Sequence, residues 1–230
     1  MSKRIVVIPD SQIRPADMPS LSSHDKPGSK SMEGKRYIED VLATTEAMDV
    51  LLEPILTMQE QQRVNKKKVW KPRRVMLGGN HEHRINRAVA NDTKLEGLIS
   101  LDDLQYEKKG WEFVPFLEPI NIEGIMFCHY FVSGVMGRPC GTARAILAKK
   151  HQSCIAGHQQ GRDIAFGRRG DGTEMACMIV GSGYEHDEEY LNPQTNNHWR
   201  GIVVLNEVVD GQFDEIMVSL RYLRSKYEKR

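Results

Sequence analysis

The segment LGGNHEHRINR, residues 77–87, decides how this chain is interpreted. It follows the apolar residues 75–77, which predict the end of a buried strand. Two glycines then allow the backbone to turn tightly. A carboxamide, two imidazoles and a carboxylate follow at once, at residues 80–83. This turn therefore offers a metal ligand and a reactive imidazole side by side, with Glu82 expected to fix the turn.

The composition is that of an ordinary globular protein. The chain has 230 residues, of which 40% are hydrophobic and 27% charged, and its net charge of +1 points to neither nucleic acid nor a membrane. The four cysteines show no C-x-x-C spacing, and no apolar run approaches a signal peptide or a membrane span. We expect one domain over residues 1–230, in the cytoplasm and without a membrane partner.

The hydrophobic pattern predicts alternating strands and helices. Arg4–Pro9 predicts a strand buried on both faces. Apolar positions at helical spacing predict a helix over residues 38–55, which Pro54 should kink or end. Residues 81–107 predict two helices, residues 111–116 and 122–130 predict strands, and residues 142–150 predict a helix capped by Thr142.

The second half of the chain is rich in strands. Asp171-Gly172 and Asp210-Gly211 each lie between strand-like runs and predict hairpins. The last eight residues predict a frayed helix. The chain as a whole predicts an α/β fold.

Polar side chains follow four of the predicted strands. Asp10 and Gln12 come after the first strand, Asn80 after the glycine pair, His129 after IMFC, and His158 and Gln160 after SCIAG. Ligands of open α/β sheets gather outside such strand ends. Carboxylate, imidazole and amide oxygen together suit divalent ions such as Mn²⁺, Zn²⁺ or Fe²⁺. A single strand-end histidine is more often structural, but the four groups together predict a metal site.

The order D-x-Q, GNHE, strand-end His and GHxQ resembles the calcineurin-like metallophosphoesterases, and in particular their phage-type members. The resemblance runs from Arg4 to about Gly183. It implies a sandwich of two mixed β-sheets flanked by helices. It also implies a two-metal site that hydrolyses phosphate esters with a metal-activated hydroxide.

The resemblance also implies a role for each matching residue. Metal one would be held by Asp10, Gln12 and Gln160. Metal two would be held by Asn80, His129 and His158. His81 would face the phosphate as a proton donor or transition-state stabiliser and would not bind metal. His83 and Arg84 follow it and are candidates for binding substrate phosphate, with a surface role as the alternative.

The chain departs from the family pattern near its N-terminus. A GDxxD motif should supply the aspartate that bridges both metals, but only six residues separate Asp10 from Asp17. A strand–helix–strand unit needs about 30 residues. We interpret Asp17 as the last aspartate of that motif, the one that orients His81, with a helix and a strand missing between Pro15 and Ala16. A natural deletion, a gene-prediction error and an omitted segment would all leave this gap. Loss of a central strand should expose edges of the first and third strands.

The predicted function is that of a metal-dependent phosphoric ester hydrolase acting on phosphomonoesters or phosphodiesters. The alternative is a catalytically impaired relative that binds phosphate or nucleic acid. Amide ligands favour Mn²⁺ as the ion at the two-metal site, with Zn²⁺, Fe²⁺ and Mg²⁺ as alternatives. Residues 65–74 hold six basic residues and a tryptophan, which form either a solvated loop or a nucleic-acid contact.

Overall fold

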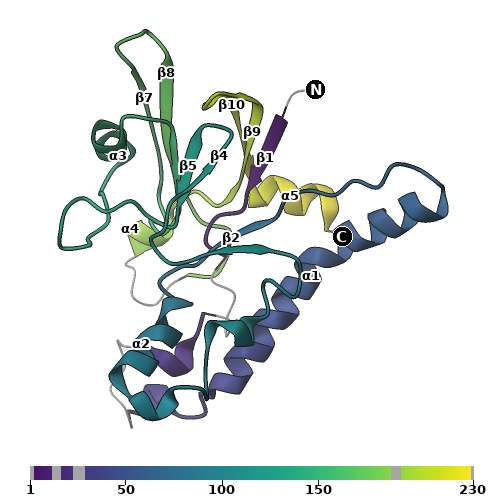
Figure 1. Ribbon diagram of the computed structural model, residues 1–230, viewed down its shortest axis with the longest axis vertical. Helices are drawn as coiled ribbons and strands as arrows, with labels where there is room; N and C mark the ends of the chain where they lie inside the picture. Colours follow the sequence, from purple (N-terminus) through teal and green to yellow (C-terminus); the bar gives the residue numbers. More distant parts are fainter. Residues whose placement is uncertain (1–2, 12–16, 23–28, 188–192, 229–230) are drawn as a thin grey trace. The chain divides into compact units, whose positions relative to one another are not determined.

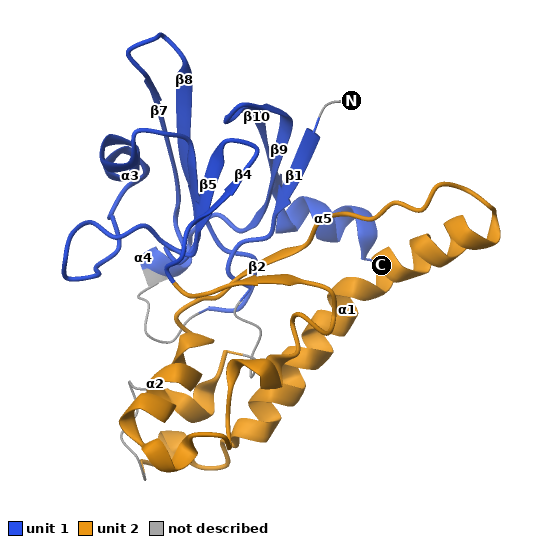
Figure 2. Cartoon of the chain, viewed as in Figure 1, with its two compact units in different colours: residues 1–12, 117–230 blue, residues 13–116 orange. Residues whose placement is uncertain are grey.

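The computed structural model divides into two compact units, coloured separately in Figure 2. Unit 1 comprises residues 1–12 and 117–230, and unit 2 comprises residues 13–116. The structure describes residues 3–11, 17–22, 29–187 and 193–228. The prediction of a single domain stays a prediction, because compactness does not tell whether either unit folds alone.

Unit 1 contains two β-sheets (Figure 1). The larger is mixed and has the strand order β4-β5-β6-β8-β7, and the smaller is antiparallel with the order β1-β9-β10. Its strands are β1 (Lys3–Val7), β4 (Ile120–Ile122), β5 (Ile125–Cys128), β6 (Cys154–Ala156), β7 (Arg162–Arg168), β8 (Glu174–Val180), β9 (Gly201–Val209) and β10 (Gln212–Ser219). Its helices are α3 (Ala143–Lys150), α4 (Pro193–Asn196) and α5 (Leu220–Tyr227). The α/β class and the helix at the C-terminal end are confirmed.

The core of the larger sheet explains the position of α3. Strands β5, β6 and β8 are buried and apolar along nearly their whole length, as expected of central parallel strands. Helix α3 packs on β7 and β8, and Ile146 and Leu147 are buried in the same cluster as the four cysteines. The Thr142 side chain accepts a hydrogen bond from the Ala145 amide, which confirms it as the N-cap.

Both predicted hairpins are present. Strands β7 and β8 pair antiparallel around Asp171-Gly172, and β9 and β10 pair around Asp210-Gly211. Asp210 and Gly211 have φ values of 49° and 83°. A two-residue turn with two positive φ angles follows the right-handed twist of its strands, and Asp-Gly is a preferred pair for it.

The first strand is less buried than the sequence predicted. Strand β1 pairs with β9 at the edge of the smaller sheet, and Val6 is 56% exposed. The prediction of burial on both faces is therefore wrong, because a run of apolar residues does not distinguish an edge strand from a central one.

Unit 2 has two longer helices and several short elements. Its helices are α1 (Tyr37–Val64) and α2 (His83–Asn91), with 3₁₀ turns η1 (Pro19–Leu21), η2 (Lys30–Met32), η3 (Thr93–Leu95) and η4 (Leu101–Leu104). Strands β2 (Val75–Leu77) and β3 (Glu112–Val114) pair in parallel. The two helices expected over residues 81–107 are thus one helix followed by two short 3₁₀ turns. The unit's core joins α1, α2 and η4 through Val41, Met48, Ile85 and Leu104.

Helix α1 continues through Pro54, so the prediction that the helix ends there is wrong, whereas the predicted kink stays a prediction. Proline removes one backbone hydrogen bond, but the residues around Pro54 are good helix formers.

Among the described residues, no helix of the chain is both long and apolar enough to cross a membrane.

Candidate metal centre

Two histidines lie at the ends of neighbouring parallel strands in unit 1. Strands β5 and β6 pair in parallel, with Cys128 opposite Ala156. The pairing extends one step further, since the Gly157 amide donates to the His129 carbonyl at 3.0 Å. His129 and His158 therefore leave the same edge of the sheet, and their ring centroids lie 5.1 Å apart.

His158 adopts a backbone conformation that is uncommon for a residue with a side chain. Its φ is 64°, and the Gln159 amide donates to the Gly157 carbonyl at 2.7 Å, which closes a three-residue γ-turn around it. Left-handed conformations of non-glycine residues carry strain and cluster at functional sites. The turn directs the backbone away from the strand at the position where the imidazole is presented.

Asp10 reaches this edge from the smaller sheet. After β1 the chain forms a single parallel bridge between Asp10 and Ser182, the residue that follows β8 by two positions. The Gly183 amide donates to the Asp10 carbonyl at 2.8 Å. Ser182 is fully buried and forms a second bridge with Arg200 ahead of β9. Asp10 is thus held against the extension of β8, one strand away from β6.

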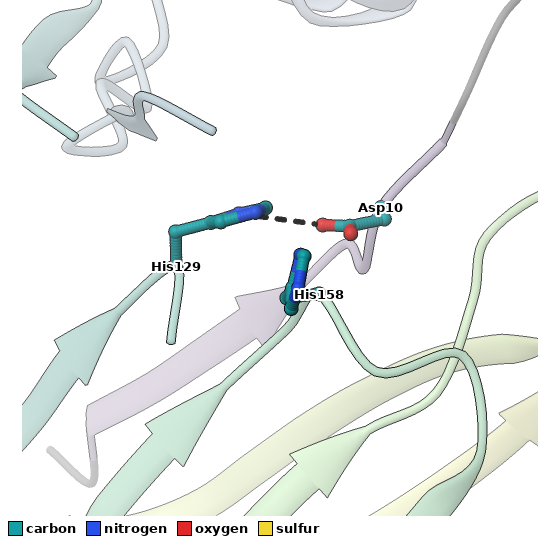
Figure 3. A group of neighbouring side chains, drawn as sticks. All are labelled: Asp10, His129 and His158. Carbon is teal, nitrogen blue, oxygen red and sulfur yellow. Dashed lines mark ion pairs between the residues drawn. The ribbon is translucent and has the colours of Figure 1, made fainter. Parts of the chain in front are cut away.

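The three side chains converge (Figure 3). The Asp10 Oδ1 and His129 Nδ1 atoms lie 3.7 Å apart. One ligand atom from each of Asp10, His129 and His158 lies within 4.8 Å of the other two. His129 is 8% exposed, whereas the other two are half-buried. A carboxylate and two imidazoles are therefore grouped at a partly shielded edge of the sheet.

This donor set fits a divalent ion. Ligand atoms about 2.1 Å from one ion lie about 3 to 3.5 Å apart in tetrahedral or cis-octahedral positions. Small rotations about the side-chain bonds of the three residues would close the remaining distance. One carboxylate with two imidazoles is a common set for Mn²⁺, Fe²⁺ and Zn²⁺. The sequence analysis divided these residues between two ions, and that division stays a prediction.

Tyr130 was missed by the sequence analysis. Its ring lies 4.7 Å from that of His158 and 5.8 Å from that of His129, and its hydroxyl donates to the Gly137 carbonyl. Burial raises the pKa of the hydroxyl, so the tyrosine is neutral at ordinary pH. It packs beside both imidazoles. Its place directly after His129 is the one signal in the sequence that points to it.

Two further predicted metal ligands belong to unit 1. Gln160 follows His158 on the same loop, and its Oε1 atom is shielded from solvent. Gln12 lies outside the described residues. The roles of both glutamines at the metal stay predictions.

The GGNHEH turn belongs to unit 2 and has the local structure that the sequence predicted. The Gly78 amide donates to the Val114 carbonyl at 2.8 Å, and a Cβ atom there would lie 2.8 Å from the Phe113 ring, so the close approach to β3 leaves little room for a side chain at position 78. Glu82 accepts a hydrogen bond from the Gly79 amide at 2.8 Å, which confirms that it fixes the turn. Asn80 lies on this turn, and its assignment to a metal stays a prediction.

His81 contacts Asp17, as the sequence analysis expected, but mainly through the backbone. Its Nδ1 atom lies 2.9 Å from the Asp17 carbonyl oxygen and 4.0 Å from the carboxylate. A carbonyl oxygen only accepts hydrogen bonds, so Nδ1 carries the hydrogen. In the neutral ring this leaves the lone pair on Nε2.

The other two candidates for phosphate binding have contacts of their own. His83 stacks on Phe116, with ring centroids 4.8 Å apart. Burial, and then the charge of Arg87, lower its pKa, which favours the neutral ring. The role of His83 in binding phosphate stays a prediction. Arg84 donates to the carbonyls of Asp17 and Met18.

The basic segment after α1 is only partly solvated. Arg73 pairs with Glu112 through two hydrogen bonds, and the Arg74 guanidinium lies 5.9 Å from the centre of the Trp111 ring. Trp70 is 50% exposed, and the lysines at positions 66–68 are exposed. The prediction of a nucleic-acid contact stays open.

Comparisons of the chain with models of protein families, with curated proteins and with solved structures found no significant match.

Proposed function

We propose that the chain is a metal-dependent phosphoesterase that hydrolyses phosphomonoesters or phosphodiesters. The observation that carries the proposal is the grouping of Asp10, His129 and His158, whose ligand atoms lie within 4.8 Å of one another at the ends of strands. The order of motifs in the sequence supports the same reading, and with it the sandwich of two mixed sheets.

The residues of the metal centre are proposed to act as follows. The Asp10 carboxylate and the imidazoles of His129 and His158 hold the divalent metal, with Tyr130 packed beside the rings. When bound, a divalent metal acidifies water and neutralises charge on the phosphoryl group. The order of motifs gives His81, in unit 2, the role of proton donor: in the protonated ring Nδ1 donates to the Asp17 carbonyl, and the proton on Nε2 is the one available for the leaving oxygen.

The experiment is a turnover assay with two generic substrates, p-nitrophenyl phosphate and bis(p-nitrophenyl) phosphate. The protein is stripped with a chelator and then titrated with Mn²⁺, Zn²⁺ or Mg²⁺. We expect turnover that depends on metal and is lost in His129→Ala and His158→Ala. His151→Asn serves as a matched control, since His151 is exposed, lies at the end of α3 in a left-handed conformation that asparagine tolerates, and belongs to the same unit.

Two results would decide against the proposal. Turnover that persists in both histidine variants would place the activity elsewhere or in a contaminant. Metal binding without turnover of either substrate would favour the alternative of a phosphate- or nucleic-acid-binding module.

A further inference from the structure

The backbone of residues 17–22 in unit 2 is held by polar side chains from three places. The Asp17 carbonyl accepts from His81 Nδ1 at 2.9 Å and from Arg84 Nη1 at 2.7 Å. The same Arg84 nitrogen lies 3.1 Å from the Met18 carbonyl. The Ser20 amide donates to the Asp40 carboxylate at 3.0 Å, and the Ser20 hydroxyl donates to the same oxygen. One short segment thus bonds to α1, to α2 and to the turn before α2.

These contacts are built into the interior of the unit. Asp40 is 1% exposed on α1, although carboxylates are rarely buried. Arg84 is half-buried on α2. Met18, whose carbonyl accepts from Arg84, is 1% exposed and lies in the apolar core with Ile85. Burying charged groups costs free energy unless they are paired or hydrogen-bonded, so their position here calls for a structural task.

This structural task concerns the tautomer of His81. An imidazole has two tautomers, and the hydrogen bond made by one nitrogen decides which atom the other presents. The Asp17 carbonyl selects the hydrogen on Nδ1, but only while it stays 2.9 Å from the ring. Arg84 fixes that carbonyl directly. Asp40 fixes the same segment three residues further on, through Ser20.

We propose that Arg84 and Asp40 are positioning residues that hold the 17–22 segment so that the Asp17 carbonyl sets the tautomer of His81. Arg84 then acts through Asp17 and not by contact with substrate phosphate. The catalytic consequence rests on the proposed function, because the tautomer with hydrogen on Nδ1 is the one that the protonated ring leaves behind when it gives up its Nε2 proton. The effect on the tautomer itself does not depend on any activity.

Two measurements on the same variants test this. The first is the ring ¹⁵N spectrum of His81 at alkaline pH, where histidine side chains are neutral. The second is the separation of kcat from KM with an aryl phosphate. The variants are Arg84→Met, which removes the donors, Arg84→Lys, which keeps one, and Arg87→Met as the matched control. Arg87 is exposed on the same helix.

In the unchanged protein and in Arg87→Met we expect the hydrogen on Nδ1. Arg84→Met should change the tautomer ratio by about 5- to 10-fold, the factor that loss of one hydrogen bond corresponds to. Its kcat should fall by about 10-fold with KM within about twofold, since the proton donor would be misplaced for part of the time. Arg84→Lys should recover most of both properties.

Ser20→Ala is a second variant with little risk to the fold, because it removes one hydroxyl from a half-buried residue. It should shift the tautomer in the same direction by a smaller factor. An unchanged tautomer in both Arg84→Met and Ser20→Ala overturns the proposal. So does a rise in KM at constant kcat in Arg84→Met, which would make Arg84 a substrate ligand. A chain without turnover whose tautomer still shifts refutes the proposed function and supports this inference.

Discussion

Gly157→Ala should weaken the metal centre without disturbing the fold. A Cβ atom on Gly157 would lie 3.0 Å from Asp10 Oδ1, whereas the nearest other atom, the His129 carbonyl oxygen, would be at an ordinary 3.6 Å. Ordinary contacts begin near 3.4 Å, so the carboxylate must move by a few tenths of an ångström. Gly157 is not among the glycines with positive φ, and alanine can adopt its backbone conformation.

The expected loss of metal affinity follows from the narrow range of metal–ligand distances. Bonds between protein ligands and a metal vary by only about 0.2 Å, so the displaced carboxylate would have to give up part of its bond. Disturbing a residue that orients a ligand typically costs about 10- to 100-fold in metal affinity. This corresponds to about 1.4 to 2.8 kcal/mol.

The assay is calorimetric titration of the chelator-treated protein with Mn²⁺. Gly134→Ala is the matched control, because a Cβ atom there meets nothing within 4 Å and the residue is exposed in the same unit. Circular dichroism and the thermal midpoint should match in all three proteins. Equal Mn²⁺ affinity in Gly157→Ala and in the unchanged protein would show that the Asp10 carboxylate does not bind the ion.

Three more outcomes are expected. His81→Ala should lower kcat by about 10²- to 10⁴-fold with its bound metal unchanged, as turnover and metal analysis would show, whereas loss of the metal would make His81 a ligand. Burial raises the pKa of Asp40 above 3.8, so the folded state binds this proton more tightly than the unfolded chain. The free energy of unfolding relative to Asp40→Asn should then fall as pH rises from about 3.8 through the raised pKa, and urea titrations showing a rise would contradict this. The four cysteines are free and buried, and burial raises the pKa of Cys154 to about 12, so a thiol reagent at pH 8 should react far more slowly with native than with urea-unfolded protein; fast native reaction would refute the buried sheet core.

The parts of the fold that depend on local chemistry could be predicted from the sequence. The cap at Thr142 and the turn at Asp210-Gly211 rest on a few neighbouring atoms and on backbone angles that those residues favour. The edge position of β1 and the continuation of α1 through Pro54 depend on what the rest of the chain places beside them. Nothing within either segment encodes this.

The candidate site also combines residues that the sequence predicts with contacts that it does not. His129 and His158 could be predicted because each comes within two residues of the end of an apolar strand, and parallel strands bring their ends together. The closeness of Asp10 to both depends on its bridge to Ser182, which is 172 positions away and has no motif of its own. The contact of His81 with the Asp17 carbonyl could not be foreseen either, because a sequence motif identifies side chains and not backbone oxygens.

The most direct test of the metal centre is anomalous diffraction from crystals grown with Mn²⁺. The account predicts an anomalous peak about 2.1 to 2.3 Å from Asp10 Oδ1 and from one ring nitrogen each of His129 and His158. A peak bound elsewhere, with these three side chains out of contact with any ion at saturating Mn²⁺, would contradict it.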